Sequence, residues 1–296
     1  MEDQHDAGHQ KTNKRNESIV IRASFSIVTY YTSLQDLQRL VESIRACSFT
    51  YALTIVDNSA SHKIQDFCST HEIDYDNPGK NLGYGSGHNR AFRKYAGKTD
   101  YHIVINPDVY FEPHTFEPLF DFMDDYKDVG LCTPRVLYPD GNLQHLCKLV
   151  PSPADLFARR FIPAFMKGII SERIRQYEMR NFDYNQNLEV PILSGCCMVL
   201  KNRALEQCGM FDERYFLYLE DVDLSRRVAQ KFSTVHYAQS SIVHHYQKSS
   251  YRKWSSLKLH LTSAVQYFNK WGWIWDKERK RLNARAKKAN DDKRVS

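Results

Sequence analysis

The sequence predicts an α/β fold with a mainly parallel sheet flanked by helices, and two observations predict it. Short apolar runs of strand character alternate with amphipathic helical segments, which is the pattern of parallel strands joined by right-handed crossovers. Three of these runs end in polar clusters, at residues 29–31, 57–59 and 106–108. The carboxyl ends of parallel strands meet at one edge of a sheet, so the clusters predict a functional site there.

The first half of the chain supplies the alternation. Ser33 is expected to cap a helix whose apolar positions recur through Ile44. A glycine-rich loop at residues 77–89 is expected to open a further helix, and its glycines permit close approach of the backbone to a nucleotide or sugar. As a phosphate-binding pattern the loop is weak, because it lacks the P-loop ending. The other expected elements are strands at residues 25–30, 53–56, 73–75 and 101–105 and a helix at residues 64–69.

The second half is less regular. A turn is expected at residues 138–141, and Asn202 is expected to cap a short helix that Gly209 ends. Residues 151–189 show no clear pattern and are expected either to cover the site or to form an ordinary surface excursion. Beyond residue 254, amphipathic helices are expected. The expected strands cover residues 129–134, 190–200, 234–237 and 241–245.

Composition favours a globular protein of the cytoplasm. The seven cysteines are odd in number and form no C-x-x-C pair, so they are expected to be reduced thiols, and neither a disulfide framework nor a zinc site is predicted. No run of 18 apolar residues occurs, and the first twenty residues contain no apolar core of a signal peptide. Neither a membrane-spanning helix nor a secretory signal is therefore expected.

Positive charge is concentrated in the C-terminal tail. From residue 252 to residue 296, there are thirteen Lys or Arg and four Asp or Glu, which gives this tail a net charge of +9. The whole chain has a net charge of +6, so the other residues carry −3. With its tryptophans, the tail could lie in the interface of a bilayer. A solvated helix packed on the domain and a coiled-coil homodimer are the alternatives. No nucleic-acid partner is expected, because the rest of the chain is acidic.

Three carboxylates, on Glu220, Asp221 and Asp223, follow an aromatic run at residues 215–218. Carboxylates at a helix start face free backbone amides and the positive end of the helix dipole. Such an ionised group beside aromatic walls suits a general base for a sugar hydroxyl. A helix cap flanked by core residues would produce the same local pattern.

A metal site is the second candidate for chemistry. Asp108 ends a strand after a proline and could reach Mg²⁺ or Mn²⁺, although Asn-Pro-Asp is also a good turn former. His244 and His245 close another strand. Successive side chains on a strand alternate, so one histidine faces the site and the other faces away. A structural histidine is equally compatible with this position.

In combination, these motifs resemble the family-2 inverting glycosyltransferases with a GT-A fold, especially rhamnosyltransferases of bacterial O-antigen and cell-surface polysaccharide assembly. The resemblance covers residues 24–276. It depends on the order and spacing of Val28-Thr29-Tyr30, Asp57-Asn58-Ser59, Asn81-x-Gly83-Tyr84-Gly85-x-Gly87-x-Asn89, Asn106-Pro107-Asp108, Gly195-Cys196-Cys197-Met198, Phe211-Asp212-Glu213 and Glu220-Asp221-Val222-Asp223.

The resemblance implies a GT-A domain at residues 23–250, with a mainly parallel nucleotide-binding sheet. The polar composition of residues 1–22, which is poor in apolar residues, predicts a disordered extension, and residues 251–296 are expected to form a basic helical region that could associate with a membrane. Asn106 stands where the family often has the first aspartate of Asp-x-Asp. Asp108 is therefore left as the charged metal ligand of this motif.

The resemblance also assigns roles to individual residues. Asp221 is the expected catalytic base, oriented by Glu220 and Asp223, and Asp57 is expected to accept the imide hydrogen of a pyrimidine. His244 is the better match to the family's metal-binding histidine, and His245 is the alternative; with Asp108 they would bind Mg²⁺ or Mn²⁺. The residues expected to bind the nucleotide sugar are Thr29, Tyr31, Asp57, Asn58, Asn81, Gly83, Gly85, Asn89, Asn106 and Asp108.

The implied reaction transfers L-rhamnose from dTDP-rhamnose to a lipid-diphosphate-linked glycan in O-antigen or lipopolysaccharide biosynthesis. The implied location is the inner face of the cytoplasmic membrane, with the protein bound peripherally. Transfer of a hexose or galactofuranose from a UDP-sugar is an alternative. A non-catalytic module that binds a sugar nucleotide is a second alternative. It is considered because Asn106 replaces an aspartate of the metal-binding motif.

Overall fold

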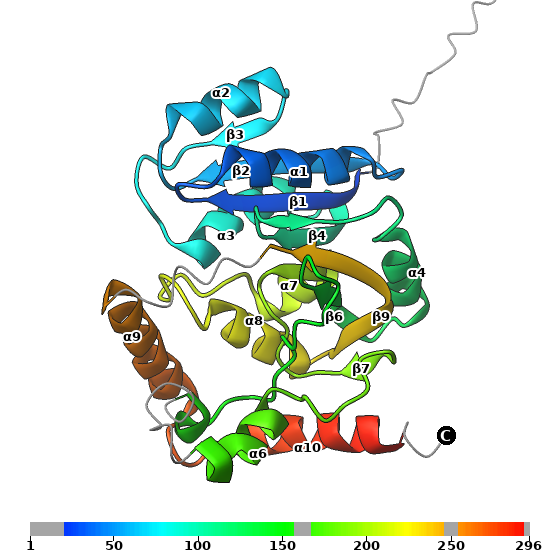
Figure 1. The fold of residues 1–296 in the computed structure, drawn as a ribbon, viewed down its shortest axis with the longest axis vertical. Coiled ribbons are helices and arrows are strands. Elements are labelled where there is room, and N and C mark those ends of the chain that lie inside the picture. Colours follow the sequence, from blue (N-terminus) through cyan, green and yellow to red (C-terminus); the bar gives the residue numbers. More distant parts are fainter. Residues whose placement is uncertain (1–20, 157–166, 246–253, 293–296) are drawn as a thin grey trace, which may run out of the picture.

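The computed structural model describes residues 21–156, 167–245 and 254–292. Figure 1 shows a central twisted sheet with helices packed around it, and C-terminal helices at the end of the molecule opposite α2 (His62–Thr70). The α/β fold with C-terminal helices predicted from the sequence is therefore confirmed. Of the N-terminal extension expected to be disordered, residues 1–20 lie outside the described residues, whereas Ile21 and Arg22 already belong to the first strand.

Nine strands of the described residues form one sheet. Their order is β3-β2-β1-β4-β8-β6-β9-β5, and β7 pairs with β9. The first four strands of this order are parallel, and so are β6 and β9, whereas β8 runs antiparallel between β4 and β6, and β5 and β7 run antiparallel to β9. The sheet is therefore mixed, and the predicted parallel arrangement holds for the half formed by β3, β2, β1 and β4. The strands are β1 (Ile21–Thr29), β2 (Tyr51–Asp57), β3 (Asp74–Asp76), β4 (Thr99–Ile105), β5 (Val109–Tyr110), β6 (Val129–Leu137), β7 (Leu188–Glu189), β8 (Cys197–Lys201) and β9 (Ser233–His244).

Most helices begin near the predicted positions, but Asn202 is the first residue of its helix, and the capping position before it is occupied by Lys201. Ser33 precedes the first helix, and its hydroxyl accepts a hydrogen bond from the amide of Asp36, as expected of a helix cap. Gly209 follows the helix formed by residues 202–208 and has a φ of 77°, a conformation that favours glycine. Besides α2, the helices are α1 (Leu34–Arg45), α3 (Tyr84–Tyr95), α4 (Glu117–Asp125), α6 (Lys167–Tyr177), α7 (Asn202–Cys208), α8 (Glu220–Ala229), α9 (Trp254–Trp271) and α10 (Lys277–Asp292).

Two expected strand regions differ from the prediction. Residues 233–244 form one strand, and a bulge lies where two separate strands were expected. Pairing with β6 passes from Tyr237 directly to Ser241, so the intervening residues are extra. Of residues 190–200, only the part from Cys197 onward is a strand. Pro191 has no amide hydrogen for a ladder, and a turn at Gly195 interrupts the chain before β8.

The C-terminal helices pack on the domain through apolar side chains. From α9, Ala264, Tyr267 and Phe268 are buried against Tyr215 and Leu219, which precede α8. From α10, Leu282 joins the same cluster. Among the helices of the described ranges, none combines the length and hydropathy that crossing a bilayer requires. The amphipathic character expected of this region therefore corresponds to packing on the domain by the apolar side chains.

A buried ion pair joins these helices to α8. Arg226 of α8 donates from both terminal nitrogens to Asp276, at 2.8 and 2.6 Å. Their side chains are only 1% and 3% exposed. The guanidinium of Arg226 also lies 4.1 Å from the ring centre of Trp271, within the range of a cation–π contact. Such a pair is costly to break from one side, because the remaining charge is left buried without a counterion.

We therefore expect Asp276→Asn to lower the free energy of unfolding by about 3–5 kcal/mol, because it strands the charge of Arg226. Urea denaturation followed by circular dichroism measures this. Glu278→Gln is the matched control, since it removes the partner of Arg281 in a pair whose side chains are 49% and 42% exposed. That change should cost less than about 1 kcal/mol. Equal losses of unfolding free energy in the two variants would show that the buried pair stabilises the fold no more than the exposed pair does.

Candidate functional site

The first polar cluster lies where β1 and β2 end side by side. Thr29 is paired with Asp57 across the sheet, and its hydroxyl donates to the Asp57 carboxylate at 3.0 Å. Asp57 is fully buried and also accepts from the amide and hydroxyl of Ser59, the amide of Ser61 and the hydroxyl of Tyr75. Both carboxylate oxygens therefore hold the loop after β2. The expected contact of Asp57 with a pyrimidine stays a prediction.

Tyr31 lies in the open beside this cluster. Its side chain is 77% exposed, and its backbone has a left-handed φ of 49°. The ring of Tyr30 lies edge-on to it, with 4.7 Å between the ring centres. A non-glycine residue in this conformation is uncommon and costs free energy. The strand end therefore presents an aromatic surface on which a nucleotide base could stack.

The glycine-rich loop is tied to the second cluster through Asn58. The Asn58 side chain donates to the carbonyl of Gly83 at 2.9 Å and accepts from the amide of Leu82 at 3.2 Å. Asn81 accepts from the amide of Gly83 at 2.9 Å. Of the residues predicted to bind a nucleotide sugar, Asn58, Asn81 and Gly83 are thus brought together. Their observed contacts shape the loop that opens α3.

The same loop closely approaches the segment before α8. Gly83 has φ of 85° and ψ of −178°, a region essentially restricted to glycine. A Cβ atom there would lie 2.1 Å from the carbonyl oxygen of Phe216, and that oxygen accepts the amide of Tyr84 at 3.0 Å. At Gly85, a Cβ atom would lie 2.9 Å from Phe211. Both glycines therefore let two distant segments come into contact.

Asn89 fastens α3 to that segment. Its side chain donates a hydrogen bond to the carbonyl of Phe211 and accepts one from the amide of Phe211, both at 2.9 Å. It also donates to the carboxylate of Glu213. Asn89 is almost completely buried. A direct contact with a sugar nucleotide stays a prediction, and the observed bonds indicate that Asn89 positions the loop that leads into α8.

The third cluster contains the candidate metal ligands. Asp108 and His244 lie together, with 3.3 Å between Oδ1 and Nε2. His245 instead approaches Asp36 of α1, at 3.4 Å from Nδ1 to Oδ1. The alternation along the strand thus selects His244 as the histidine that faces Asp108, and His245 lies away from it. Asn106 Nδ2 is 3.5 Å from His244 Nε2, so Asn106 belongs to the same group.

Gln144, which the sequence analysis missed, sets the orientation of His244. Its amide nitrogen donates to the carbonyls of Leu137 and His244, at 3.1 and 2.8 Å. Its oxygen is therefore the acceptor that faces His244 Nδ1 at 3.1 Å. With the proton on Nδ1, Nε2 is the ring nitrogen that faces Asp108, and in the neutral imidazole it is the one that can bind a cation. No sequence signal marks Gln144, because it follows a turn and reaches His244 only through the fold.

This arrangement fits a divalent cation. An imidazole nitrogen and a carboxylate oxygen face each other at 3.3 Å, and two ligands at right angles on one Mg²⁺ or Mn²⁺ would be about 3 Å apart. A hydrogen bond made by the other ring nitrogen is also typical of metal-binding histidines. Within the described ranges, no cluster of three or more His, Cys, Asp or Glu side chains forms a complete metal site. Further oxygen ligands would have to come from phosphates and water.

The first turn of α8, which contains Glu220, Asp221 and Asp223 and is called the acidic turn below, is connected to the candidate metal ligands. Asp221 accepts from the amide of Gly195 at 3.0 Å and from the amide of Val222 at 2.8 Å. The carbonyl of Gly195 accepts the hydroxyl of Tyr84 at 2.6 Å, and that hydroxyl also lies 3.0 Å from the Asn106 side-chain oxygen. Tyr84 thus links the strand end of Asn106 to the loop that orients Asp221.

Glu220 is buried beside Asp221. Its side chain is 5% exposed, and one carboxyl oxygen has no hydrogen-bond partner among the described residues. Burial, reinforced by the charge of Asp221, raises the pKa of Glu220 well above its usual value. The expected role of Glu220 in orienting Asp221 stays a prediction.

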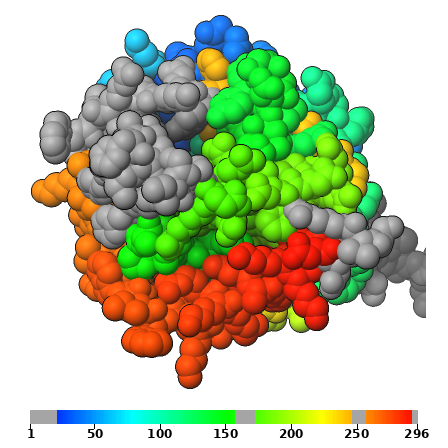
Figure 2. Space-filling view, turned by 60° about the horizontal axis from the view of Figure 1, so that its bottom comes forward, coloured from blue at the N-terminus to red at the C-terminus, as the bar shows by residue number. Residues whose placement is uncertain are grey.

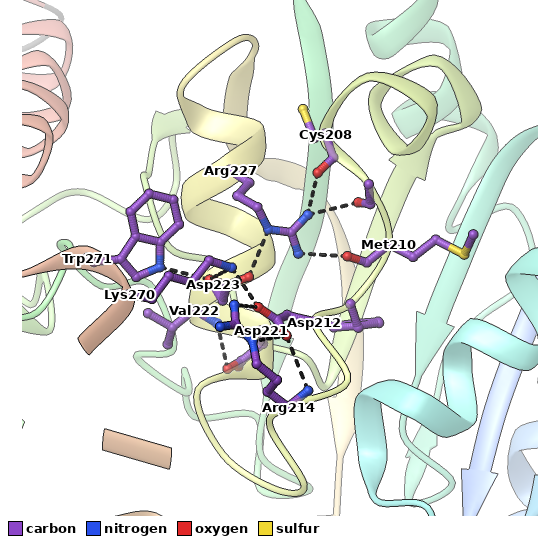
Figure 3. Close-up of polar contacts among 12 residues, drawn as sticks. Cys208, Met210, Asp212, Arg214, Asp221, Val222, Asp223, Arg227, Lys270 and Trp271 are labelled. Carbon is purple, nitrogen blue, oxygen red and sulfur yellow. Dashed lines mark hydrogen bonds and ion pairs between the residues drawn. The ribbon is translucent and has the colours of Figure 1, made fainter. Parts of the chain in front are cut away.

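Asp223 points toward the C-terminal helices. Figure 3 shows its carboxylate surrounded by Arg227, Lys270 and Trp271. The carboxylate accepts from Arg227 at 2.8 Å, Trp271 at 2.8 Å and Lys270 at 2.7 Å, and it is fully buried. These contacts anchor α8 to α9. A role of Asp223 in orienting the base or the acceptor stays a prediction that no observed contact supports directly.

The backbone that enters α8 is strained. Tyr218 and Leu219 have consecutive left-handed φ angles of 72° and 67°. Each such residue costs about 1–3 kcal/mol and persists only where the surroundings enforce it. Leu219 is buried against the C-terminal helices, and the carbonyl of Leu217 accepts the hydroxyl of Ser263 at 2.8 Å. The C-terminal helices therefore contribute to holding this strained entry.

We expect Gly83→Ala to destabilise the fold by at least about 2 kcal/mol more than Gly79→Ala. Both residues have positive φ, 85° and 73°, but a Cβ atom at Gly79 would have nothing within 4 Å. The difference therefore reports the constraint at Gly83, which combines its contact with Phe216 and its glycine-only backbone conformation. Thermal unfolding at equal protein concentration measures both variants. Equal shifts would mean that this close approach does not constrain the loop.

The comparisons with known proteins identify the family. The sequence pattern of the family described as Glycosyl transferase family 2 matches residues 26–209, more than half of the chain. The chain is 32% identical over 193 residues to an N-acetylglucosaminyl-diphospho-decaprenol L-rhamnosyltransferase of Mycobacterium tuberculosis, and this match covers 59% of each protein. It is 24% identical to Rhamnosyltransferase WbbL of Escherichia coli K12, over 78% of this chain and 87% of that protein.

Solved structures agree on the fold. The chain superposes on S. aureus TarS 1-349 in complex with UDP with a TM-score of 0.56 and 13% identity, covering 90% of this chain and 70% of that one. It superposes on GalNAc-T7 with UDP, GalNAc and Mn²⁺ with a TM-score of 0.58 and 12% identity, covering 77% of this chain and 44% of that one. At such identities the likeness concerns the fold. The family pattern shows that the chain belongs to glycosyl transferase family 2.

Proposed function

We propose that this protein is an inverting glycosyltransferase that moves L-rhamnose from dTDP-rhamnose to a hydroxyl of a lipid-diphosphate-linked glycan. Family membership supports the reaction class, and the names of the Mycobacterium tuberculosis and Escherichia coli relatives support the sugar. The relative from Mycobacterium tuberculosis, named for a diphospho-decaprenol acceptor, supports a lipid-linked acceptor. A place in O-antigen or lipopolysaccharide assembly, at the inner face of the cytoplasmic membrane, is part of the same proposal.

The observation that carries the proposal is the position of Asp221 at the start of α8. Two amides hold its carboxylate in one orientation, and the chain from Gly195 through Tyr84 to Asn106 connects it to the candidate metal ligands. A fixed carboxylate beside a diphosphate site can take the proton of an acceptor hydroxyl. The hydroxyl oxygen would then attack the anomeric carbon from the face opposite the departing nucleoside diphosphate.

In this mechanism one bond forms as another breaks. The new glycosidic bond forms at the anomeric carbon while its bond to the diphosphate breaks, so the configuration inverts and no covalent enzyme intermediate is needed. Asp108 and His244 would hold Mg²⁺ or Mn²⁺, which when bound offsets the negative charge of the diphosphate. Tyr31 would stack on the base, and the loop shaped by Asn58 and Gly83 would bring backbone amides close to the nucleotide.

Asp221→Asn tests the assignment of the base. We expect transfer to fall by about a hundredfold or more, because the amide cannot accept the hydroxyl proton. Donor affinity measured by calorimetry should stay unchanged, since the donor does not contact this carboxylate in the proposed mechanism. Asp66→Asn is the control, because Asp66 is exposed on α2. Full activity of Asp221→Asn would remove Asp221 as the base.

A calorimetric panel tests the donor. We expect dTDP-rhamnose to bind more tightly than UDP-glucose, UDP-galactose, UDP-N-acetylglucosamine and GDP-mannose, and Mn²⁺ to strengthen binding. His244→Gln should reduce the gain from Mn²⁺, because it removes one candidate ligand, whereas His245→Gln should not. Preference for a UDP-sugar would show that the proposed donor is wrong, while the proposed reaction class would stand. Absence of binding across the panel would contradict the proposed activity.

A further inference from the structure

The connection between α9 and α10 exposes large apolar side chains. Ile274 is 73% exposed and Trp275 is 87% exposed. The neighbouring Trp273 is 39% exposed and is held by a hydrogen bond from its ring nitrogen to Asn269, at 2.9 Å. Two adjacent apolar side chains that project this far from a folded domain are a candidate interaction site.

A stripe of positive charge continues from this connection along α10. The buried positions Leu282, Ala286 and Asn290 face the domain. The exposed positions recur at helical spacing on the opposite side, where lysine and arginine dominate. We call these exposed residues and the connection the basic face. It consists of Ile274, Trp275, Lys277, Lys280, Arg281, Ala284, Lys287, Lys288 and Asp291.

The basic face belongs to a part of the molecule that is firmly attached to the domain. Figure 2 shows α10 in red and α9 in orange, both packed along the body of the protein. The side chain of Asn283 exchanges hydrogen bonds with the backbone of Val150, at 2.7 and 3.1 Å, and Asn290 does the same with Glu189, at 3.0 and 2.9 Å. The outward orientation of the lysines is therefore fixed by the packing of α10.

The distribution of charge and apolar surface fits the interface of a lipid bilayer. A protein partner usually meets an apolar centre enclosed by a polar rim. Here the apolar side chains stand at one end, and cations extend along the helix. Tryptophan is suited to the headgroup level of a bilayer, and lysines are attracted to anionic lipid. We propose that the basic face docks this protein onto the surface of an anionic bilayer, with α10 lying along it.

Docking through this face would also orient the candidate active site. Asp276, directly after Trp275, accepts both terminal nitrogens of Arg226 and the amide of Arg279 at 2.8 Å. Arg226 belongs to the helix that begins with Glu220 and Asp221. The anchor and the proposed base are therefore parts of one rigidly bonded unit. The inference does not depend on the proposed donor or acceptor, because binding to lipid can be measured without either.

Co-sedimentation of the full chain with vesicles tests the proposal. We expect binding to phosphatidylcholine vesicles that contain phosphatidylglycerol, weaker binding to phosphatidylcholine alone, and loss of the difference at high salt, because salt screens the lysines. Ile274→Ser with Trp275→Ser should weaken binding to the anionic vesicles by about tenfold or more. Lys280→Gln with Lys287→Gln should weaken it to a similar degree and reduce its dependence on salt.

Matched controls use exposed residues far from α10. Tyr126→Ser removes an aromatic side chain that is 56% exposed, and Lys63→Gln with Lys127→Gln removes two exposed lysines. Both controls should bind as the wild type does, and circular dichroism should show all variants folded. Equal binding of the wild type to both vesicle types would overturn the proposal. Unchanged binding of both test variants would overturn it too, as would a wild-type dimer that the Ile274 and Trp275 changes dissociate.

Discussion

The site depends on how α8 is held. Asp221 lies on the side of this helix that faces Gly195, whereas Asp223 and Arg226 are buried with partners from the C-terminal region. A buried charge without a counterion is far more costly than a buried pair, so Arg226 requires Asp276 to stay in place. Asp223 is also paired with Arg227 of the same helix, and its bonds to Lys270 and Trp271 add a second connection to α9. The C-terminal helices are consequently part of the scaffold of the site, although the family pattern ends at residue 209.

The strained entry to α8 has the same origin. Two left-handed residues in a row would relax in a free loop, yet the amide of Tyr84 and the hydroxyl of Ser263 donate to the carbonyls of Phe216 and Leu217, directly before them. Gly83 is needed because Phe216 leaves no room for a side chain. The loop before α3, the segment before α8 and the helix α9 are thus fitted together, and the orientation of the acidic turn follows from that fit.

Sequence patterns predicted the parts of this arrangement that depend on local chemistry. The strand ends at Thr29, Asp57 and Asn106, the cap at Ser33 and the acidic helix start at Glu220 follow from periodicity and backbone geometry. Gln144 and the direction of Asp223 could not be predicted, because their partners are distant in the chain and no short motif marks them. The bulge in β9 was missed for a similar reason, since pairing with β6 continues across residues that looked like a break.

Asn106 gains a physical explanation from its neighbours. Its oxygen lies 3.0 Å from the hydroxyl of Tyr84, which is closer to the carbonyl of Gly195, and its amide nitrogen lies 3.5 Å from Nε2 of His244. An aspartate at this position would present a second negative charge to Asp108. The neutral asparagine avoids this additional negative charge. It also leaves the group with a single carboxylate, so a cation there would depend more strongly on the charge of a diphosphate. Asn106 was the residue for which a non-catalytic function was considered. In this geometry it is compatible with a catalytic site.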